Sequence, residues 1–334
     1  GIFIVAADIS RQVGSPGLLL ATWVVTAVLT VIAALSYGEL AAAMPRAGGQ
    51  YVYLREAFGP LSGFLFGWTM FVVIQTGTIA AVAVAFAKFA GVFFPWIGAR
   101  NTLLPRFSTQ QLVAIGVIVF LTALNTRGLR TGARVQNVFT IAKVGALLGI
   151  IGLGFLFGRN PEAIQRNFSN FWGEASFGWT AIRLVGVGMV GALFSSDAWN
   201  NVTFTAGEVR NPRRDLPLSL ALGVGIVSAL YLGCNLAYLS ALPLEAIQRA
   251  PEDRVATAVA SAILGPLAVQ AMAAAIMVST FGCLNGLILA GARVYYAMAL
   301  DGLFFKSAAR LDPVHHTPVA SLVMQCAWAC LLTL

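Results

Sequence analysis

The chain has 334 residues, of which 58% are hydrophobic and only 10% are charged, and its formal net charge is +8. An ordinary soluble domain carries about a quarter charged residues, so this chain has too few charges to cover a surface that faces water. The composition excludes a disordered chain, a coiled coil and a secreted disulfide scaffold, and it argues against an ordinary cytosolic enzyme. It predicts a polytopic membrane protein whose Lys and Arg residues fix loop orientation rather than bind nucleic acid.

Apolar runs long enough to span a bilayer follow one another along the chain, and their continuity predicts helices rather than barrel strands. After a leading piece from Gly1 to about Ile9, we expect spans at 17–44, 61–94, 110–124, 137–157, 179–208, 215–242 and 256–299, and a last segment from about Pro318. Ser15 and Pro16 form a typical N-cap and first helical residue for the 17–44 span. Both ends of the chain lie in apolar segments, so we expect a piece of a longer protein, truncated at both ends.

Lys and Arg are more frequent in one set of alternating loops, with eleven against seven on the other side. This excess predicts that the loops around Arg46, Arg127, Arg213 and Lys306 are cytoplasmic, in a multi-pass protein of the cell membrane. The four cysteines all lie in apolar runs, which indicates small buried side chains rather than a disulfide framework.

The 179–208 span is interrupted by a polar segment, Phe194-Ser195-Ser196-Asp197-Ala198-Trp199-Asn200-Asn201. Ser, Asp and Asn compete for backbone hydrogen bonds, and a break at membrane depth is tolerated only beside a cavity or against protein. We therefore predict a discontinuous helix whose free backbone groups offer a site for an anion such as a carboxylate. The alternative is a helix that simply ends at Phe194. Five spans earlier, Gly1-Ile2-Phe3 opens the chain, and paired interruptions of this kind are typical of inverted-repeat transporters.

Two charged residues lie within predicted spans. Asp197 is interpreted either as a contact for a substrate amine or a proton, or as a cap of the half-helix beside it. Lys143 is interpreted either as a fixed ammonium that holds backbone carbonyls and couples transport to protons, or as a lysine that snorkels to the membrane surface.

Other polar and aromatic residues leave alternatives open. Ser279 and Asn285 lie in a segment of small residues that either packs helices closely or lines a cavity. By residue type alone, Phe194 and Trp199 are as consistent with core packing as with a gate. The adjacent pair His315-His316 lacks a third ligand, which favours a solvated loop over a metal site. Motifs of zinc proteases, P-loops and nucleophile elbows are absent, so we expect no enzymatic activity, metal or cofactor.

Several longer motifs resemble those of one family of permeases. They are Ser36 to Leu40, Met44 to Tyr53, Phe194 to Asn200, Gly207 to Pro217, Asn285-Gly286, Ala292-Arg293 and Tyr296 to Leu303, together with the short Gly1-Ile2-Phe3. The chain resembles the amino acid–polyamine–organocation superfamily, particularly its L-type amino acid transporter branch, over nearly its whole length.

The resemblance implies a leucine-transporter-like fold of two inverted repeats with discontinuous first and sixth helices. In this single domain, 1–158 would be the first repeat and 176–334 an incomplete second repeat. An amino acid would be bound by unwound backbone. The implied substrate-binding residues are Gly1, Ile2 and Phe3, then Phe194 as the gating aromatic, Ser195, Ser196, Asp197 and Trp199, and also Ser279. Lys143 would stand in for a sodium ion.

The implied function is secondary active amino acid transport by alternating access, either sodium-independent exchange or proton-coupled uptake. Transport of polyamines or cationic amines is an alternative that Asp197 favours, and a channel or receptor is a weaker one. The Ser196-Asp197 pair is more polar than the animal pattern and weighs against large neutral substrates. Animal members carry a partner-linking cysteine between the third and fourth helices. The segment Pro95 to Gln110 has none, so the expected partners are substrate and membrane lipid, without a disulfide-linked subunit.

Overall fold

The computed structural model describes residues 1–105, 107–173 and 178–334, without the side chains of 129–131. Two of the charges counted for the orientation are affected: Arg106 lies outside the described residues, and the side chain of Arg130 is not described. The predicted start of the second repeat at 176 lies outside them as well. The described residues form two compact units. Unit 1 comprises Gly1–Ser36, Val144–Trp199 and Leu220–Met272, and unit 2 comprises Tyr37–Lys143, Asn200–Ser219 and Ala273–Leu334.

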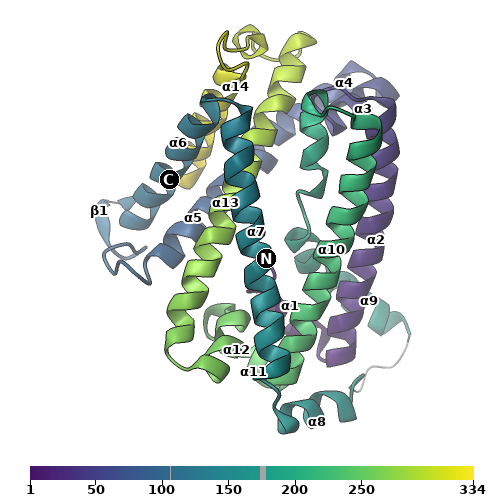
Figure 1. Cartoon of the computed structure of the whole chain (residues 1–334), viewed down its shortest axis with the longest axis vertical. Coiled ribbons are helices and arrows are strands. Elements are labelled where there is room, and N and C mark those ends of the chain that lie inside the picture. Colours follow the sequence, from purple (N-terminus) through teal and green to yellow (C-terminus); the bar gives the residue numbers. More distant parts are fainter. Residues whose placement is uncertain (106, 174–177) are drawn as a thin grey trace. The chain divides into compact units, whose positions relative to one another are not determined.

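Seven helical segments among the described residues are long and apolar enough to span a membrane, so the chain is an all-α multi-pass membrane protein (Figure 1). They are α2 (Pro16–Ala43), α4, η1 and α5 together (Pro60–Ala90), α6 (Thr109–Thr126), α7 (Leu129–Leu156), α9 with η2 (Trp179–Glu208), α10 (Pro212–Ala241) and α13 (Leu267–Leu300). Two apolar helices are shorter, α12 (Val255–Leu264) and α14 (Val319–Thr333).

Short elements connect these helices. They are α1 (Val5–Val13), α3 (Gln50–Phe58), α8 (Pro161–Ser169), α11 (Leu244–Gln248), the 3₁₀ turns η3 (Pro251–Asp253) and η4 (Lys306–Ala309), and an antiparallel hairpin of β1 (Thr102–Leu104) and β2 (Phe107–Ser108). The sequence analysis did not predict α3, α8 or the hairpin. None of the four cysteines forms a disulfide within the described residues. The predicted burial is correct for Cys234 only, because Cys283, Cys326 and Cys330 are half-buried.

The predicted start of α2 is confirmed, because the Leu18 N–H donates to Ser15 Oγ at 3.3 Å and Pro16 is the first helical residue. The single predicted span at 256–299 is wrong. It consists of α12 and α13, separated at Gly265, whose φ is 67°. A left-handed residue followed by Pro266, which has no N–H to donate, stops one helix and starts the next. The predicted start of the 137–157 span is also late, since α7 begins at Leu129.

In unit 1, glycines allow α1 to pack closely on α9. A Cβ added at Gly191 would lie 2.7 Å from Val5 Cγ1, and one added at Gly188 would lie 3.1 Å from Val13 Cγ1. Both distances are too short for a larger residue without movement of the neighbour. Small residues at such positions bring helix backbones together in membrane proteins, where dispersion contacts replace the hydrophobic driving force.

In unit 2, amide side chains join neighbouring helices to α13. The Asn285 side chain is fully buried and donates to Gly132 O at 3.0 Å and to Gln136 Oε1 at 3.2 Å, both on α7. Its Oδ1 accepts from Asn125 Nδ2 of α6 at 3.0 Å. Asn285 therefore holds three helices together, and the cavity-lining alternative for this residue is wrong.

Two glutamines bond the next turn of α13. Gln75 Nε2 donates to Leu287 O at 2.8 Å, and Gln325 Nε2 donates to Ile288 O at 3.2 Å. Gln75 follows η1 (Met70–Ile74), a π-turn within the α4–α5 segment. Helices α5, α6, α7 and α14 are thus all hydrogen-bonded to one stretch of α13.

We expect Asn285→Leu to lower the free energy of unfolding of the full-length protein by about 1–3 kcal/mol, because its buried partners lose their hydrogen bonds. Thermal melts in detergent measure the change. Asn137→Leu is the matched control, since Asn137 is exposed on α7, and its melting temperature should stay near that of the parent. Equal melting temperatures for parent and Asn285→Leu would contradict the role given to this network.

Candidate functional site

Helix α9 breaks where the polar segment predicted a discontinuity. The α-helix ends at Ser195, and the Ser196 N–H is shared between Ala192 O at 3.1 Å and Leu193 O at 3.0 Å. Ala198 then adopts a left-handed φ of 68°, and the 3₁₀ helix η2 begins at Trp199. A left-handed residue cannot continue an α-helix, so the regular bonding stops here and some backbone groups of the segment lose their helical partners.

The half after the break is held by a glycine pair in unit 2. Gly48 N–H donates to Phe204 O at 3.0 Å. Gly49 has a φ of 45°, and a Cβ added there would overlap Thr203 Oγ1. Glycine is needed at Gly49 both for its backbone conformation and for the close approach to η2. The Gly48-Gly49 part of the permease-like motif therefore serves to seat η2.

Polar side chains complete this attachment of η2. Asn200 Nδ2 donates to Gln50 Oε1 at 3.1 Å. At the other end of η2, Glu208 Oε1 accepts from Arg293 Nε of α13 at 3.0 Å, and Arg293 is only 2% exposed. A guanidinium so deeply buried requires a charged partner, since leaving it unpaired would cost several kcal/mol.

A second non-helical segment, Gly1 to Ile4, precedes α1. Gly1 O accepts from both the Ile4 N–H at 2.9 Å and the Val5 N–H at 3.1 Å, while Phe3 O accepts from the Ala256 N–H of α12 at 3.3 Å. The side chains of Ile2 and Phe3 are 3% and 8% exposed. These two residues can therefore offer a ligand only their backbone groups.

The two breaks adjoin within unit 1. A Cβ added at Gly1 would lie 3.8 Å from both Cβ and Oγ of Ser195. Near this point α1 begins, with the partial positive charge of its N–H groups, and α9 ends, with the partial negative charge of its carbonyls. The arrangement suits a small ligand that carries an anionic and a cationic group on neighbouring atoms.

Tyr231 of α10 is a contact that the sequence analysis missed. Its hydroxyl donates to Ser195 O at 3.1 Å, so it satisfies one carbonyl at the end of α9. The Trp23 ring of α2 packs edge-on against Tyr231, with a centroid distance of 5.5 Å. The only sequence signal was a hydroxylated aromatic within an otherwise apolar span, which does not identify a partner.

The other predicted residues of the α9 break differ in exposure. Phe194 is 64% exposed, Asp197 is exposed, and Ser196 and Trp199 are half-buried. Ser195 Oγ is bonded to Gly191 O at 3.0 Å. Within the described chain no backbone N–H donates to the Asp197 carboxylate, so the helix-cap interpretation of Asp197 has no support. Asp197 stays a predicted ligand contact.

Lys143 and Ser279 belong to unit 2, on α7 and α13, and both are half-buried. Across the described part of the chain, the Lys143 ammonium has no hydrogen-bond or ion-pair partner. The structure thus brings together Gly1 and Ser195, whereas the roles of Lys143 and Ser279 stay predictions.

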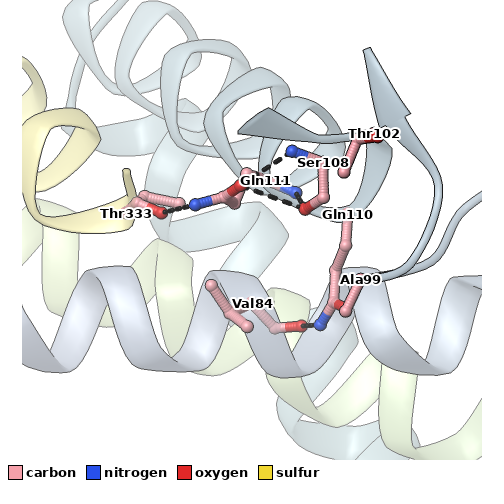
Figure 2. Close-up of a pocket in the computed structure, with 7 residues that line it drawn as sticks. All are labelled: Val84, Ala99, Thr102, Ser108, Gln110, Gln111 and Thr333. Carbon is pink, nitrogen blue, oxygen red and sulfur yellow. Dashed lines mark hydrogen bonds between the residues drawn. The ribbon is translucent and has the colours of Figure 1, made fainter. Parts of the chain in front are cut away.

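A cavity of about 430 Å³ in unit 2 contains none of the predicted site residues (Figure 2). It is lined by Val84, Ala99, Thr102, Ser108, Gln110, Gln111 and Thr333. Gln110 Nε2 donates to Val84 O at 3.2 Å, and Gln111 Nε2 donates to Thr333 O at 3.0 Å. Its glutamine amides are thus engaged with backbone carbonyls, and among the described residues its lining includes no titratable side chain, so we assign it no binding role.

We expect Tyr231→Phe to speed amide hydrogen exchange at Ser196 and Asp197 about fivefold, because loss of one hydrogen bond of about 1 kcal/mol loosens the end of α9. Exchange mass spectrometry on the full-length protein measures this. The matched control is Tyr238→Phe on the same helix, because the Tyr238 hydroxyl is buried without a hydrogen-bond partner among the described residues. Identical exchange in the two variants would show that the Tyr231 hydroxyl does not hold the break.

Comparison with known proteins identifies the family to which the chain is similar. A family model for amino acid permeases matches residues 1–334. The b(0,+)-type amino acid transporter 1 of Mus musculus is 30% identical over 326 residues, which are 97% of this chain and 64% of the mouse protein. The large neutral amino acids transporter small subunit 2 of Homo sapiens is 30% identical over 335 residues, 98% of this chain and 59% of the human protein.

A third relative, the Asc-type amino acid transporter 1 of Homo sapiens, is 28% identical over 331 residues, 98% of this chain and 60% of that protein. The chain thus spans about three fifths of the length of the curated relatives it matches. Because the family model covers every residue, from the break before α1 to the end of α14, the chain belongs to the amino acid permease family.

Proposed function

We propose that the protein of which this chain is part transports amino acids across the cell membrane by alternating access, and that it is not an enzyme. The observation that supports this function is the contact between Gly1 and Ser195, which joins two non-helical segments inside unit 1. The names of the three relatives all describe amino acid transporters. Transport is either sodium-independent exchange or proton-coupled uptake.

In this proposal the backbone recognises the parts that all amino acids share. The α-carboxylate binds N–H groups near Ile2 and Phe3 at the start of α1, because a helix N-terminus favours an anion. The α-ammonium binds carbonyls at the end of α9, where the helix dipole favours a cation. Phe194 and Trp199 border the substrate, and Ser196, Asp197 and Ser279 contact its side chain. Recognition through backbone leaves room for different substrate side chains.

Lys143 supplies the fixed positive charge that other transporters of this fold obtain from a bound cation. A half-buried ammonium is costly inside a membrane span, so it needs neighbouring carbonyls there. Coupling of transport to protons through Lys143 is the alternative role. Snorkelling to the cytoplasmic surface is the competing interpretation.

We also propose the inverted repeats 1–158 and 176–334, and cytoplasmic loops around Arg46, Arg127, Arg213 and Lys306. Helices α1 and α9 lie wholly in unit 1, whereas α5 and α6 lie wholly in unit 2. This division supports the proposal that α1 and α9 move during transport while α5 and α6 belong to a scaffold. We propose no disulfide-linked subunit, since the four cysteines lie in the apolar helices α10, α13 and α14.

Transport of polyamines or cationic amines is a second candidate, favoured by the exposed Asp197 carboxylate at the α9 break. The test is uptake of a radiolabelled amino acid and polyamine panel by the full-length protein in proteoliposomes. Uptake is measured with and without sodium, and with and without a pH gradient. We expect saturable uptake of amino acids without sodium. Uptake of polyamines alone would support the second candidate, and uptake of neither class would refute both.

Asp197→Asn in the same assay separates the candidates. If Asp197 contacts a substrate amine, the variant should take up cationic substrates about tenfold more slowly, because an amide has no net charge to pair with the cation. Uptake of neutral substrates should stay unchanged. An unchanged substrate ranking would remove Asp197 from the substrate contacts.

We expect Lys143→Ala to reduce the initial uptake rate about tenfold or more while the melting temperature stays within a few degrees, because it removes a functional charge rather than a packed core residue. Lys88→Ala on α5 is the matched control, since Lys88 is an exposed lysine near the end of its helix. Normal uptake by Lys143→Ala would place Lys143 among the snorkelling residues.

A further inference from the structure

Two loops that are far apart in the sequence meet at one end of unit 2. The first is the turn between α6 and α7, and the second is the 305–317 segment between α13 and α14 (Figure 1). Thr317 Oγ1 donates to Thr126 O at 3.0 Å, and a Cβ added at Gly128 would lie 3.8 Å from His315 Nδ1. We call these two segments together the loop pair.

The loop pair and the first turns of α7 carry exposed cations. They are Arg127, Arg134, Lys306 and Arg310. For none of these four does the described chain contain a carboxylate within ion-pair distance. Their charges are therefore free to interact with an anion from outside the protein.

The acidic residues nearby already have partners. Asp301 pairs with Arg55 and accepts from Tyr51 Oη at 2.8 Å. Asp312 Oδ1 accepts backbone N–H groups of His315 at 2.7 Å and Val314 at 3.0 Å, and these bonds hold the pKa of the Asp312 carboxyl below its ordinary value. Asp312 therefore contributes one negative charge to the loop pair, which is outnumbered by the positive charges of Arg127, Lys306 and Arg310.

Apolar side chains protrude from the same loop. Phe305 is 55% exposed, Leu311 41% and Val314 74%. Exposed apolar side chains among cations are typical of protein surfaces that lie at the boundary between lipid headgroups and acyl chains.

We propose that the loop pair binds the headgroup of an anionic phospholipid. The phosphate is bound by Arg127, Lys306 and Arg310, while Phe305 and Val314 enter the acyl boundary. A single headgroup then bridges the α6–α7 turn and the α13–α14 loop, both parts of unit 2. This goes beyond the orienting effect of positive loops, which depends on the number of charges and does not require the loops to touch. The proposal rests on the membrane class of the chain and is independent of its transport activity.

The test measures lipid binding directly. Full-length protein, delipidated in detergent, is titrated with phosphatidylglycerol or phosphatidylcholine that carries a fluorescent acyl chain, and anisotropy reports binding. We expect phosphatidylglycerol to bind more tightly. The triple variant Arg127→Gln, Lys306→Gln, Arg310→Gln should weaken its binding about tenfold or more, because each lost cation removes part of the electrostatic attraction.

Two controls separate a built surface from general charge. The variant Arg100→Gln, Arg159→Gln, Arg249→Gln loses the same charge from exposed positions outside the loop pair and should bind like the parent. Thr317→Val keeps every charge but removes the hydrogen bond between the two loops. It should weaken phosphatidylglycerol binding about threefold, which is less than the effect expected from a full hydrogen bond of about 1 kcal/mol.

Equal affinity for the two lipids, or equal losses in the triple variant and its charge-matched control, would overturn the proposal. If the triple variant does not fold, Arg310→Gln alone should weaken phosphatidylglycerol binding about threefold, and its absence of effect would count against the loop pair. Because the readout is lipid binding, failure here leaves the proposed transport function untouched, and failure of transport leaves the lipid site untouched.

Discussion

The bonding of backbone groups at the α9 break is the constraint on which the rest of the candidate site depends. The hydrocarbon core of a bilayer supplies no water to N–H and C=O groups, so a helix that stops there must find other partners for them. The Ser196 N–H is shared between two carbonyls, and Ser195 O receives the Tyr231 hydroxyl. In the proposed function, groups without such partners bind the zwitterionic substrate.

Side-chain hydrogen bonds and close packing at glycines hold the helices within each compact unit. In unit 2 the amides of Gln75, Asn125, Asn285 and Gln325 tie several helices to α13. In unit 1 glycines bring α1 and α9 into close contact, as Gly191 shows, so those helices meet through dispersion contacts. Hydrogen bonds join other helices of unit 1, since the Tyr231 hydroxyl of α10 donates to Ser195 O of α9 and Gln248 Nε2 of α11 donates to Ser10 O of α1.

The permease-like motif around Gly48 and Gly49 has a structural explanation in these contacts. Both glycines lie against η2, where Gly48 donates to Phe204 O and Gly49 leaves no room for a side chain beside Thr203. The ion pair between the buried Arg293 and Glu208 secures the other end of the same 3₁₀ helix. Gly48-Gly49 and Arg293, which belong to permease-like motifs distant in the sequence, thus hold η2 in unit 2. Helix α9, the other half of the interrupted span, belongs to unit 1.

The sequence by itself determined the membrane class, most spans, the Ser15 cap and the position of the α9 break, because apolar length and polar interruption are local properties. The division of 256–299 at Gly265 had a local signal too, which the long apolar run obscured. Only the tertiary structure decided that Gly1 adjoins Ser195 and that Tyr231 bonds the end of α9. It also decided that Asn285 is buried among helices. These contacts join residues far apart in the chain, and they follow from packing that no local pattern encodes.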